Sequence, residues 1–140
     1  MNWKLRIENW KLRIERSYIA LKNLRLRALH GVMPQERQTG GDFLVSVRVG
    51  RDVSRAVLTD EVADTLNYAR LYELVREEMA VPSALIEHVA GRIGQRIFSE
   101  FPEVETADVE LTKLNPPMGA ECDGASVELH LINDKTRGNL

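Results

Sequence analysis

The chain has 140 residues with a hydrophobic fraction of 44%, a charged fraction of 29% and a net charge of −2, values of an ordinary water-soluble domain that is long enough to bury a core. The small net charge argues against a general nucleic-acid binder, and a single cysteine, Cys122, excludes an intrachain disulfide and fits a reducing cytoplasm. No apolar run approaches the roughly 20 residues of a membrane span, and charges interrupt the N-terminus too often for a signal peptide.

The N-terminus carries a duplication, because residues 2–8 read Asn-Trp-Lys-Leu-Arg-Ile-Glu and residues 9–15 repeat them without a change. One strand through both copies is excluded, since an odd shift moves the second copy to the opposite face. A helix would align the apolar side chains of Trp3, Ile7, Trp10 and Ile14. Two interpretations stay open: one copy is dispensable, or the segment binds a partner helix or nucleic acid through Lys4, Arg6, Lys11, Arg13 and Arg16. We divide the chain into this segment, 1–16, and a domain, 17–140.

Two strands are expected at the start of the domain. Residues 18–29 alternate like a strand, but the apolar phase changes at Lys22 and Asn23, which indicates a β-bulge there. A loop over 30–41 then leads into a second strand, whose alternating apolar residues are Phe43, Val45, Val47 and Val49.

Two helices and two more strands should follow an irregular connection over 50–66. The first helix is expected at about 68–79. The second should open at Pro82 and Ser83 and end near Ser99, with an apolar stripe formed by Ile86, Val89, Ala90, Ile93 and Ile97. Strands at about 105–113 and 125–132 complete the order ββααββ. This order predicts an α+β fold, in which an antiparallel sheet carries two helices on one face.

Lys113 ends its predicted strand in an unusual way. Every second residue before it is apolar, so the face that buries these side chains also presents the Lys113 ammonium group. The prolines at 116 and 117 then stop the strand. The pattern fits either a lysine that projects into a pocket or one whose stem packs while its head reaches water.

Glu87 is a candidate ligand-binding residue on the second helix. Gly91 and Gly94 follow it at helical spacing, although a glycine costs about 1 kcal/mol relative to alanine within a helix. A carboxylate above such a bare groove could hold a flat ligand with adjacent N–H donors through two hydrogen bonds. The alternative is a surface glutamate on a helix that packs tightly against the sheet.

Other candidates for chemistry are fewer. Glu36 lies in a predicted loop, where most glutamates are only solvated, and Tyr68 begins the first helix, where its phenol could reach outward or pack half-buried. The three histidines, His30, His88 and His130, share no metal-ligand spacing. Cys122 has no neighbouring base in the sequence. What remains is acid–base chemistry without a metal or cofactor.

Taken together, these positions resemble the dihydroneopterin aldolase family over residues 18–131. The matching stretches are His30-Gly31 with Glu36 and Gly40, Thr65-Leu66-Asn67-Tyr68, Leu85-Ile86-Glu87-His88-Val89-Ala90, Leu111-Thr112-Lys113-Leu114-Asn115-Pro116-Pro117, and Asp123-Gly124. Leu29 replaces an aromatic residue often found before His-Gly, and residues 119–122 depart from the usual loop. Both departures bear on substrate preference.

The resemblance implies a tunnelling fold, in which the ββααββ unit oligomerises into a barrel ring of commonly four subunits, with two rings stacked into an octamer. Ring closure would pair the free strand edges, and the active sites would lie between neighbouring subunits. Lys113 would be the general acid/base, acting through a bound water that Glu36 holds, and Tyr68 would come from the neighbouring subunit. The implied substrate-binding positions are Glu87, Ile86, Leu66 and Asn67.

The implied activity is retro-aldol cleavage of 7,8-dihydroneopterin to glycolaldehyde and 6-hydroxymethyl-7,8-dihydropterin, in folate biosynthesis. It implies a small-molecule pterin substrate, a cytoplasmic homo-oligomer, no nucleic-acid or membrane partner, and no metal or cofactor. Three alternatives stay open: an epimerase acting on dihydroneopterin or its triphosphate, a non-catalytic pterin- or purine-binding ring, and a basic-arm nucleic-acid binder.

Overall fold

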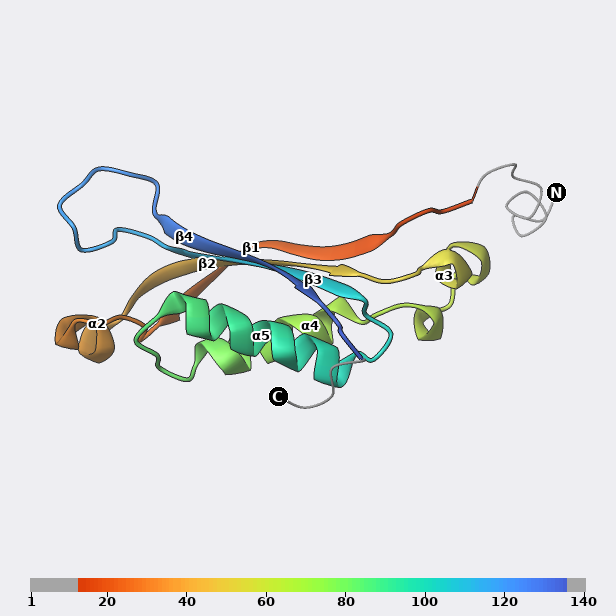
Figure 1. Cartoon of the computed structure of the whole chain (residues 1–140), viewed down its shortest axis with the longest axis horizontal. Helices are drawn as coiled ribbons and strands as arrows, with labels where there is room; N and C mark the ends of the chain where they lie inside the picture. Colours follow the sequence, from red (N-terminus) through yellow and green to blue (C-terminus); the bar gives the residue numbers. More distant parts are fainter. Residues whose placement is uncertain (1–12, 136–140) are drawn as a thin grey trace.

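The computed structural model of the chain describes residues 13–135. A four-stranded sheet carries two long helices on one face, while no described helix covers the other face (Figure 1). The elements in chain order are β1 (Tyr18–Ala28), α2 (Pro34–Thr39), β2 (Gly41–Gly50), α3 (Ser54–Thr59), the 3-10 turn η1 (Val62–Asp64), α4 (Tyr68–Met79), α5 (Ile86–Glu100), β3 (Thr106–Lys113) and β4 (Ala125–Ile132). The predicted α+β class and the order ββααββ of the main elements are therefore confirmed.

The short helices correct the expectation of irregular chain over 30–41 and 50–66, where α2, α3 and η1 lie. Local polar groups close these turns. In α2, Pro34 occupies the first turn and the Glu36 carboxylate accepts a hydrogen bond from the Met33 backbone N–H, at 3.3 Å. Before α3, the Asp52 carboxylate accepts one from the Ser54 N–H, at 2.9 Å. Apolar periodicity could not reveal such short elements.

The strands pair in the order β1-β2-β3-β4, and every pair is antiparallel. The predicted bulge is confirmed, because the β1–β2 register shifts between Leu21 and Leu24. Asn23 adopts a φ of 56° there, and its backbone N–H donates to the Ser46 hydroxyl at 2.8 Å. An asparagine tolerates this left-handed conformation better than most residues. The bulge lets both halves of β1 turn apolar side chains to the same face.

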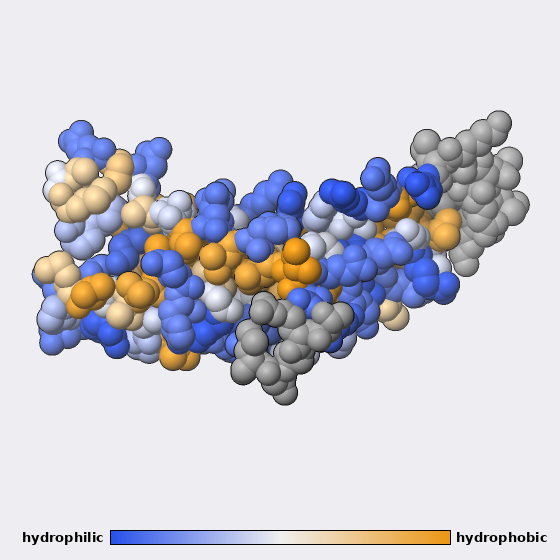
Figure 2. All heavy atoms as spheres, in the orientation of Figure 1, coloured by the Kyte–Doolittle hydropathy of each residue, from blue (hydrophilic) through white to orange (hydrophobic). Residues whose placement is uncertain are grey.

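The core lies between the sheet and the helix pair. Its buried side chains come from the two central strands and the inner faces of α4 and α5: Phe43, Val45, Val47, Val49, Ala107, Val109, Leu111, Leu71, Leu74, Val75, Val89, Ala90, Ile93 and Ile97. The inward side chains of β1 and β4 are only half-buried. Figure 2 shows apolar side chains in a band between the polar outer surfaces of the two layers. The sheet therefore has apolar, unpaired edges at β1 and β4 in one chain.

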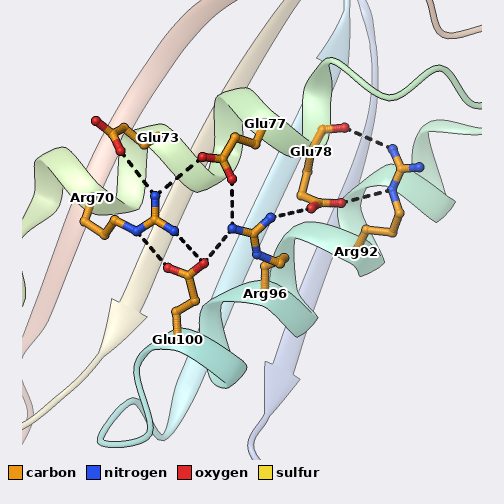
Figure 3. A network of polar contacts seen from close by, with 7 residues as sticks. All are labelled: Arg70, Glu73, Glu77, Glu78, Arg92, Arg96 and Glu100. Atoms are coloured by element: carbon orange, nitrogen blue, oxygen red, sulfur yellow. Dashed lines mark hydrogen bonds and ion pairs between the residues drawn. The ribbon is translucent and has the colours of Figure 1, made fainter.

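A network of ion pairs joins the outer surfaces of α4 and α5 (Figure 3). The Arg70 guanidinium lies 2.7 Å from Glu100, and Arg96 lies 2.9 Å from Glu77 and 2.8 Å from Glu78. These contacts join the start of α4 to the end of α5, and the end of α4 to the middle of α5. The helices are therefore antiparallel, and their N-termini lie at opposite ends of the molecule (Figure 1).

Helix α5 begins later than predicted, at Ile86 rather than at Pro82 and Ser83. Leu85 is extended, with φ −118° and ψ 132°. The Ser83 carbonyl accepts a hydrogen bond from the Gly31 N–H at 2.9 Å, and the Arg92 guanidinium donates to the Val81 carbonyl at 2.9 Å. These tertiary contacts hold the segment in a non-helical form, which overrides the favourable position of Pro82.

Most of the duplicated N-terminal segment, residues 2–12, lies outside the described residues, so its two interpretations stay predictions. Of the second copy, residues 13–15 belong to neither a helix nor a strand. Among the helices of the described part of the chain, none has the length and apolar character needed to cross a membrane.

Candidate active site

The centre of the candidate site is an ion pair between Lys113 and Glu36. The Lys113 ammonium lies 2.7 Å from a Glu36 carboxylate oxygen, and the side chains are 17% and 19% exposed. Lys113 follows Leu111 on the helix-covered face of β3, as the alternating pattern predicts. Its head contacts a carboxylate within a pocket. Of the two interpretations of Lys113, the structure therefore supports the pocket and not the solvated strand end.

Gly31 makes room for Glu36. Its φ is +156°, and a Cβ at this position would lie 2.4 Å from the Glu36 carboxyl carbon. Any larger residue would therefore displace the carboxylate from Lys113. Glu36 is fixed on its other side by the Met33 N–H. Lys113 holds the pKa of Glu36 below its ordinary value of 4.5, burial works against this shift, and the Met33 N–H adds to it.

A pocket of about 320 Å³ surrounds the pair. It is built from His30 and α2, from the start of β2, and from the end of β3 with the β3–β4 connection, which includes Asn115 and Pro117. Asn115 takes a left-handed φ of 51°, so the chain turns immediately after Lys113. Two hollows elsewhere, of about 390 and 570 Å³, contain none of the predicted site residues. The pocket of about 320 Å³ around Lys113 and Glu36 is therefore the candidate site.

His30 forms part of the pocket wall and was not predicted to have a role there. Its side chain is 1% exposed, and neither ring nitrogen makes a hydrogen bond of normal geometry, although one has a weak contact with the Met79 backbone. The ring packs edge-to-face on Phe43, with the centroids 5.3 Å apart. Burial lowers the pKa of His30 to about 4, and the positive charges of Arg92, Lys113 and Arg37 add to this, while the weak hydrogen bond with the Met79 backbone opposes it. His30 is therefore neutral near pH 7.

Glu87 lies at the same end of the molecule as the pocket. It is exposed in the first turn of α5, directly after the segment that Gly31 holds through Ser83. No hydrogen bond or ion pair with another of residues 13–135 occupies its carboxylate. The predicted glycine groove is wrong at Gly94, where an added Cβ would lie 2.1 Å from Leu131 of β4. Gly94 permits close packing of α5 on the sheet.

Tyr68 lies far from Lys113 within one chain. Tyr68 begins α4 near the end of α5, whereas Lys113 ends β3 beside α2 at the other end (Figure 1). Its side chain is 65% exposed. Asn67 caps α4 by accepting a hydrogen bond from the Ala69 N–H at 2.9 Å, and the Leu66 side chain is in the core. Of the predicted site residues, one chain brings together Glu36 and Lys113, with Glu87 and the half-buried Ile86 at the same end.

The described residues hold no cluster of histidine, cysteine or acidic side chains that could bind a metal ion. Cys122 is a free thiol, exposed in the β3–β4 connection. The site can therefore offer an ammonium group, a carboxylate and a neutral imidazole.

Comparison with known proteins identifies the family of the chain. The family model for dihydroneopterin aldolase matches residues 19–130. A dihydroneopterin aldolase of Staphylococcus epidermidis is 38% identical over 117 residues, which span 83% of this chain and 97% of that protein. The chain belongs to the dihydroneopterin aldolase family. The residues matched by the dihydroneopterin aldolase model, 19–130, span both partners of the Lys113–Glu36 pair.

Solved structures share the dihydroneopterin aldolase fold. A putative dihydroneopterin aldolase from Vibrio cholerae superposes with a TM-score of 0.77 at 24% identity, over 85% of this chain and 99% of that one. The Escherichia coli dihydroneopterin aldolase, solved in complex with neopterin, gives 0.76 at 22% identity, over 82% and 98%. At these identities the superpositions support the fold alone.

Proposed function

We propose that this protein catalyses the cofactor-independent retro-aldol cleavage of 7,8-dihydroneopterin to glycolaldehyde and 6-hydroxymethyl-7,8-dihydropterin, in folate biosynthesis. The observation that carries the proposal is the buried Lys113–Glu36 pair in a pocket, in a chain of the dihydroneopterin aldolase family. The protein would be a carbon–carbon lyase of the cytoplasm.

The chemistry requires proton transfer more than electron withdrawal by the protein. When the bond between C1′ and C2′ breaks, its electron pair moves into the C=N bond of the pterin ring next to C1′. The proton of the 2′-hydroxyl leaves, so that glycolaldehyde forms, and a proton is then delivered to C1′ of the enol intermediate. A lysine Schiff base would be redundant, because the ring accepts the electrons.

Lys113 is the proposed general acid/base, acting through a bound water. Glu36 would hold this water and keep the ammonium group in place, which its 2.7 Å contact with Lys113 supports. Tyr68 would help to move the proton of the hydroxyl. Its wide separation from Lys113 in one chain supports the proposal that it comes from a neighbouring subunit.

Glu87 is the proposed anchor for the pterin ring. A carboxylate accepts two parallel hydrogen bonds from an amino group and an adjacent ring N–H, and the Glu87 carboxylate is exposed at the pocket end of α5. Ile86, Leu66 and Asn67 would complete the binding surface. The Leu66 side chain is in the core and the Asn67 amide oxygen caps α4, so these two would contribute through their backbone groups.

A homo-oligomeric ring would complete the site. The edge strands β1 and β4 have unpaired backbone groups and half-buried apolar side chains, and strand pairing between copies would satisfy both. A ring of four subunits, or two such rings in an octamer, would bring the Tyr68 end of one copy to the Lys113 end of the next. The segment 1–16 would be dispensable, and deleting residues 2–8 should leave both activity and assembly unchanged.

The decisive experiment is an aldolase assay with 7,8-dihydroneopterin in excess chelator, with the products separated by chromatography. We expect glycolaldehyde and 6-hydroxymethyl-7,8-dihydropterin, and no adduct after borohydride treatment. Loss of activity on chelation would contradict the metal-free mechanism, and a reduced lysine adduct would contradict acid–base catalysis. If the 2′-epimer of the substrate is the only product, the protein is an epimerase. Pterin binding without turnover would indicate a non-catalytic ring.

A further inference from the structure

His30 combines three properties that a purely structural core residue rarely has. It is buried to 99%, neither ring nitrogen makes a hydrogen bond of normal geometry, with only a weak contact to the Met79 backbone, and it lines the pocket that holds Lys113 and Glu36. An unsatisfied buried polar group costs about 1–3 kcal/mol. Buried side-chain polar atoms are therefore nearly always paired, and an exception calls for a partner from outside the chain.

The charges around His30 restrict what that partner can be. Arg92 of α5, Arg37 of α2 and Lys113 of β3 all oppose a positive charge on the ring. The imidazole is therefore neutral near pH 7, with one nitrogen that donates and one that accepts. The weak contact with the Met79 backbone raises the pKa, as expected for a ring N–H that donates to a backbone carbonyl. The other nitrogen is then the acceptor, and it is available to a donor from the pocket.

Lys113 offers the complementary half of a binding position. Its ammonium group has three N–H donors, and its contact with Glu36 uses one of them. An atom between Lys113 and His30 would have to accept from the ammonium and donate to the imidazole. A carbonyl or an anion cannot donate, and a cation cannot accept. A hydroxyl oxygen does both.

We propose that His30 is a positioning residue that binds a hydroxyl-class oxygen beside Lys113, either from a water or from the side chain of the bound pterin. The inference rests on the proposed function, because it places this oxygen next to the group that transfers protons. His30 would fix the direction of the O–H bond and thereby the direction of proton transfer.

The test compares His30→Leu, which removes both nitrogens, with His30→Asn and His30→Gln, whose amides approach the positions of Nδ1 and Nε2. His130→Gln, on the helix-free face of the sheet, is the histidine control. We expect His30→Leu to lower kcat/KM roughly 3- to 10-fold, the value of one hydrogen bond, and one amide to restore most of it. The thermal midpoint of the His30→Leu variant should equal or exceed that of the wild type, because a polar group without a normal hydrogen bond is removed.

Two ligands distinguish the sources of the oxygen. If it belongs to the pterin, His30→Leu should weaken binding of 6-hydroxymethyl-7,8-dihydropterin and leave that of 6-methyl-7,8-dihydropterin unchanged. If it is a water, the affinity for both should stay constant while kcat falls. Unchanged kcat and affinities, or a loss of activity that follows a loss of folded protein, would overturn the inference. Binding is measured without turnover, so a wild type that binds pterins but does not cleave them would refute the aldolase alone.

Discussion

The Lys113 ammonium group lies 2.7 Å from the Glu36 carboxylate, although 77 residues separate them in the chain. Lys113 ends a core strand and Glu36 lies in a six-residue helix, so only the tertiary fold brings the two side chains together. Both side chains are more than four-fifths buried. Such a pair is costly to desolvate and adds little net stability, which fits a role in chemistry.

Replacing Lys113 with alanine should reduce kcat by about 10²- to 10⁴-fold, the usual contribution of a general acid/base. The Kd of a pterin product should change by less than about threefold, because Glu87 is the proposed anchor of the ring. Steady-state kinetics and a fluorescence titration measure the two quantities. Lys22→Ala, exposed on β1, is the matched control. Turnover equal to that of the wild type would remove Lys113 from the mechanism.

Replacing Glu87 with alanine should mainly weaken binding. Loss of two charge-assisted hydrogen bonds predicts a Kd roughly 10- to 100-fold higher, with a smaller change in kcat at saturating substrate. Glu103→Ala, an exposed glutamate outside the helices, should behave like the wild type. A Glu87→Ala variant that binds pterins normally would show that the anchor lies elsewhere.

Tyr68 and Lys113 should complement each other across subunits. Tyr68→Phe and Lys113→Ala variants, each weakly active alone, should regain activity when they are co-refolded, because some interfaces would then combine an intact Tyr68 with an intact Lys113. Random mixing in a ring restores about one quarter of the sites. Activity that never exceeds the sum of the separate variants would place both residues in the same subunit's site.

The buried His30 should make stability depend on pH. Its pKa is lowered from 6.5 to about 4, so the unfolded chain binds more protons between these values. With respect to His30, the free energy of unfolding should therefore be at its maximum above pH 6.5 and fall by up to about 3 kcal/mol as the pH approaches 4. His30→Leu should lack this part of the dependence. Urea unfolding of both proteins at pH 5 and pH 8 measures the difference, and parallel behaviour would contradict the prediction.

Arg96 should contribute more to stability than an isolated surface arginine. It joins Glu100, Glu77 and Glu78 across two helices, whereas the ion pair of Arg55 within residues 13–135 is with Asp64, and the Arg55 side chain is 78% exposed. We expect Arg96→Met to lower Tm by a few degrees and Arg55→Met to leave it unchanged. Calorimetry at low and high salt checks this, and equal effects of the two variants would argue against a cooperative network.

The sequence predicts the strands and long helices well, because apolar side chains repeat along β2, β3 and α5 over enough residues to fix the period. It also places Lys113 on the core face. It could not reveal the partner of Lys113, since Glu36 looks like any loop glutamate until the fold brings them together. The start of α5 was wrong by four residues, because a hydrogen bond from Gly31 to Ser83 decides it.

His30 shows a second limit of the sequence. The sequence offered no role for it beyond the absence of a metal-ligand spacing, because burial without a hydrogen bond of normal geometry is a property of the packed structure alone. A buried histidine directly before a glycine with positive φ carries no periodic signal. Only the combined positions of Phe43, Lys113 and Arg92 make its environment unusual.

The ion pairs between the antiparallel helices α4 and α5 keep the Tyr68 end and the Lys113 end of each subunit at a fixed separation. In a ring, every subunit would therefore serve two catalytic centres, donating Tyr68 to one and Lys113 to the other. A subunit that carries both Tyr68→Phe and Lys113→Ala would inactivate two catalytic centres each time it enters an assembly of wild-type subunits. Such a variant should act as a dominant inhibitor when it is co-expressed with the wild type, with a potency about twice that of either single substitution.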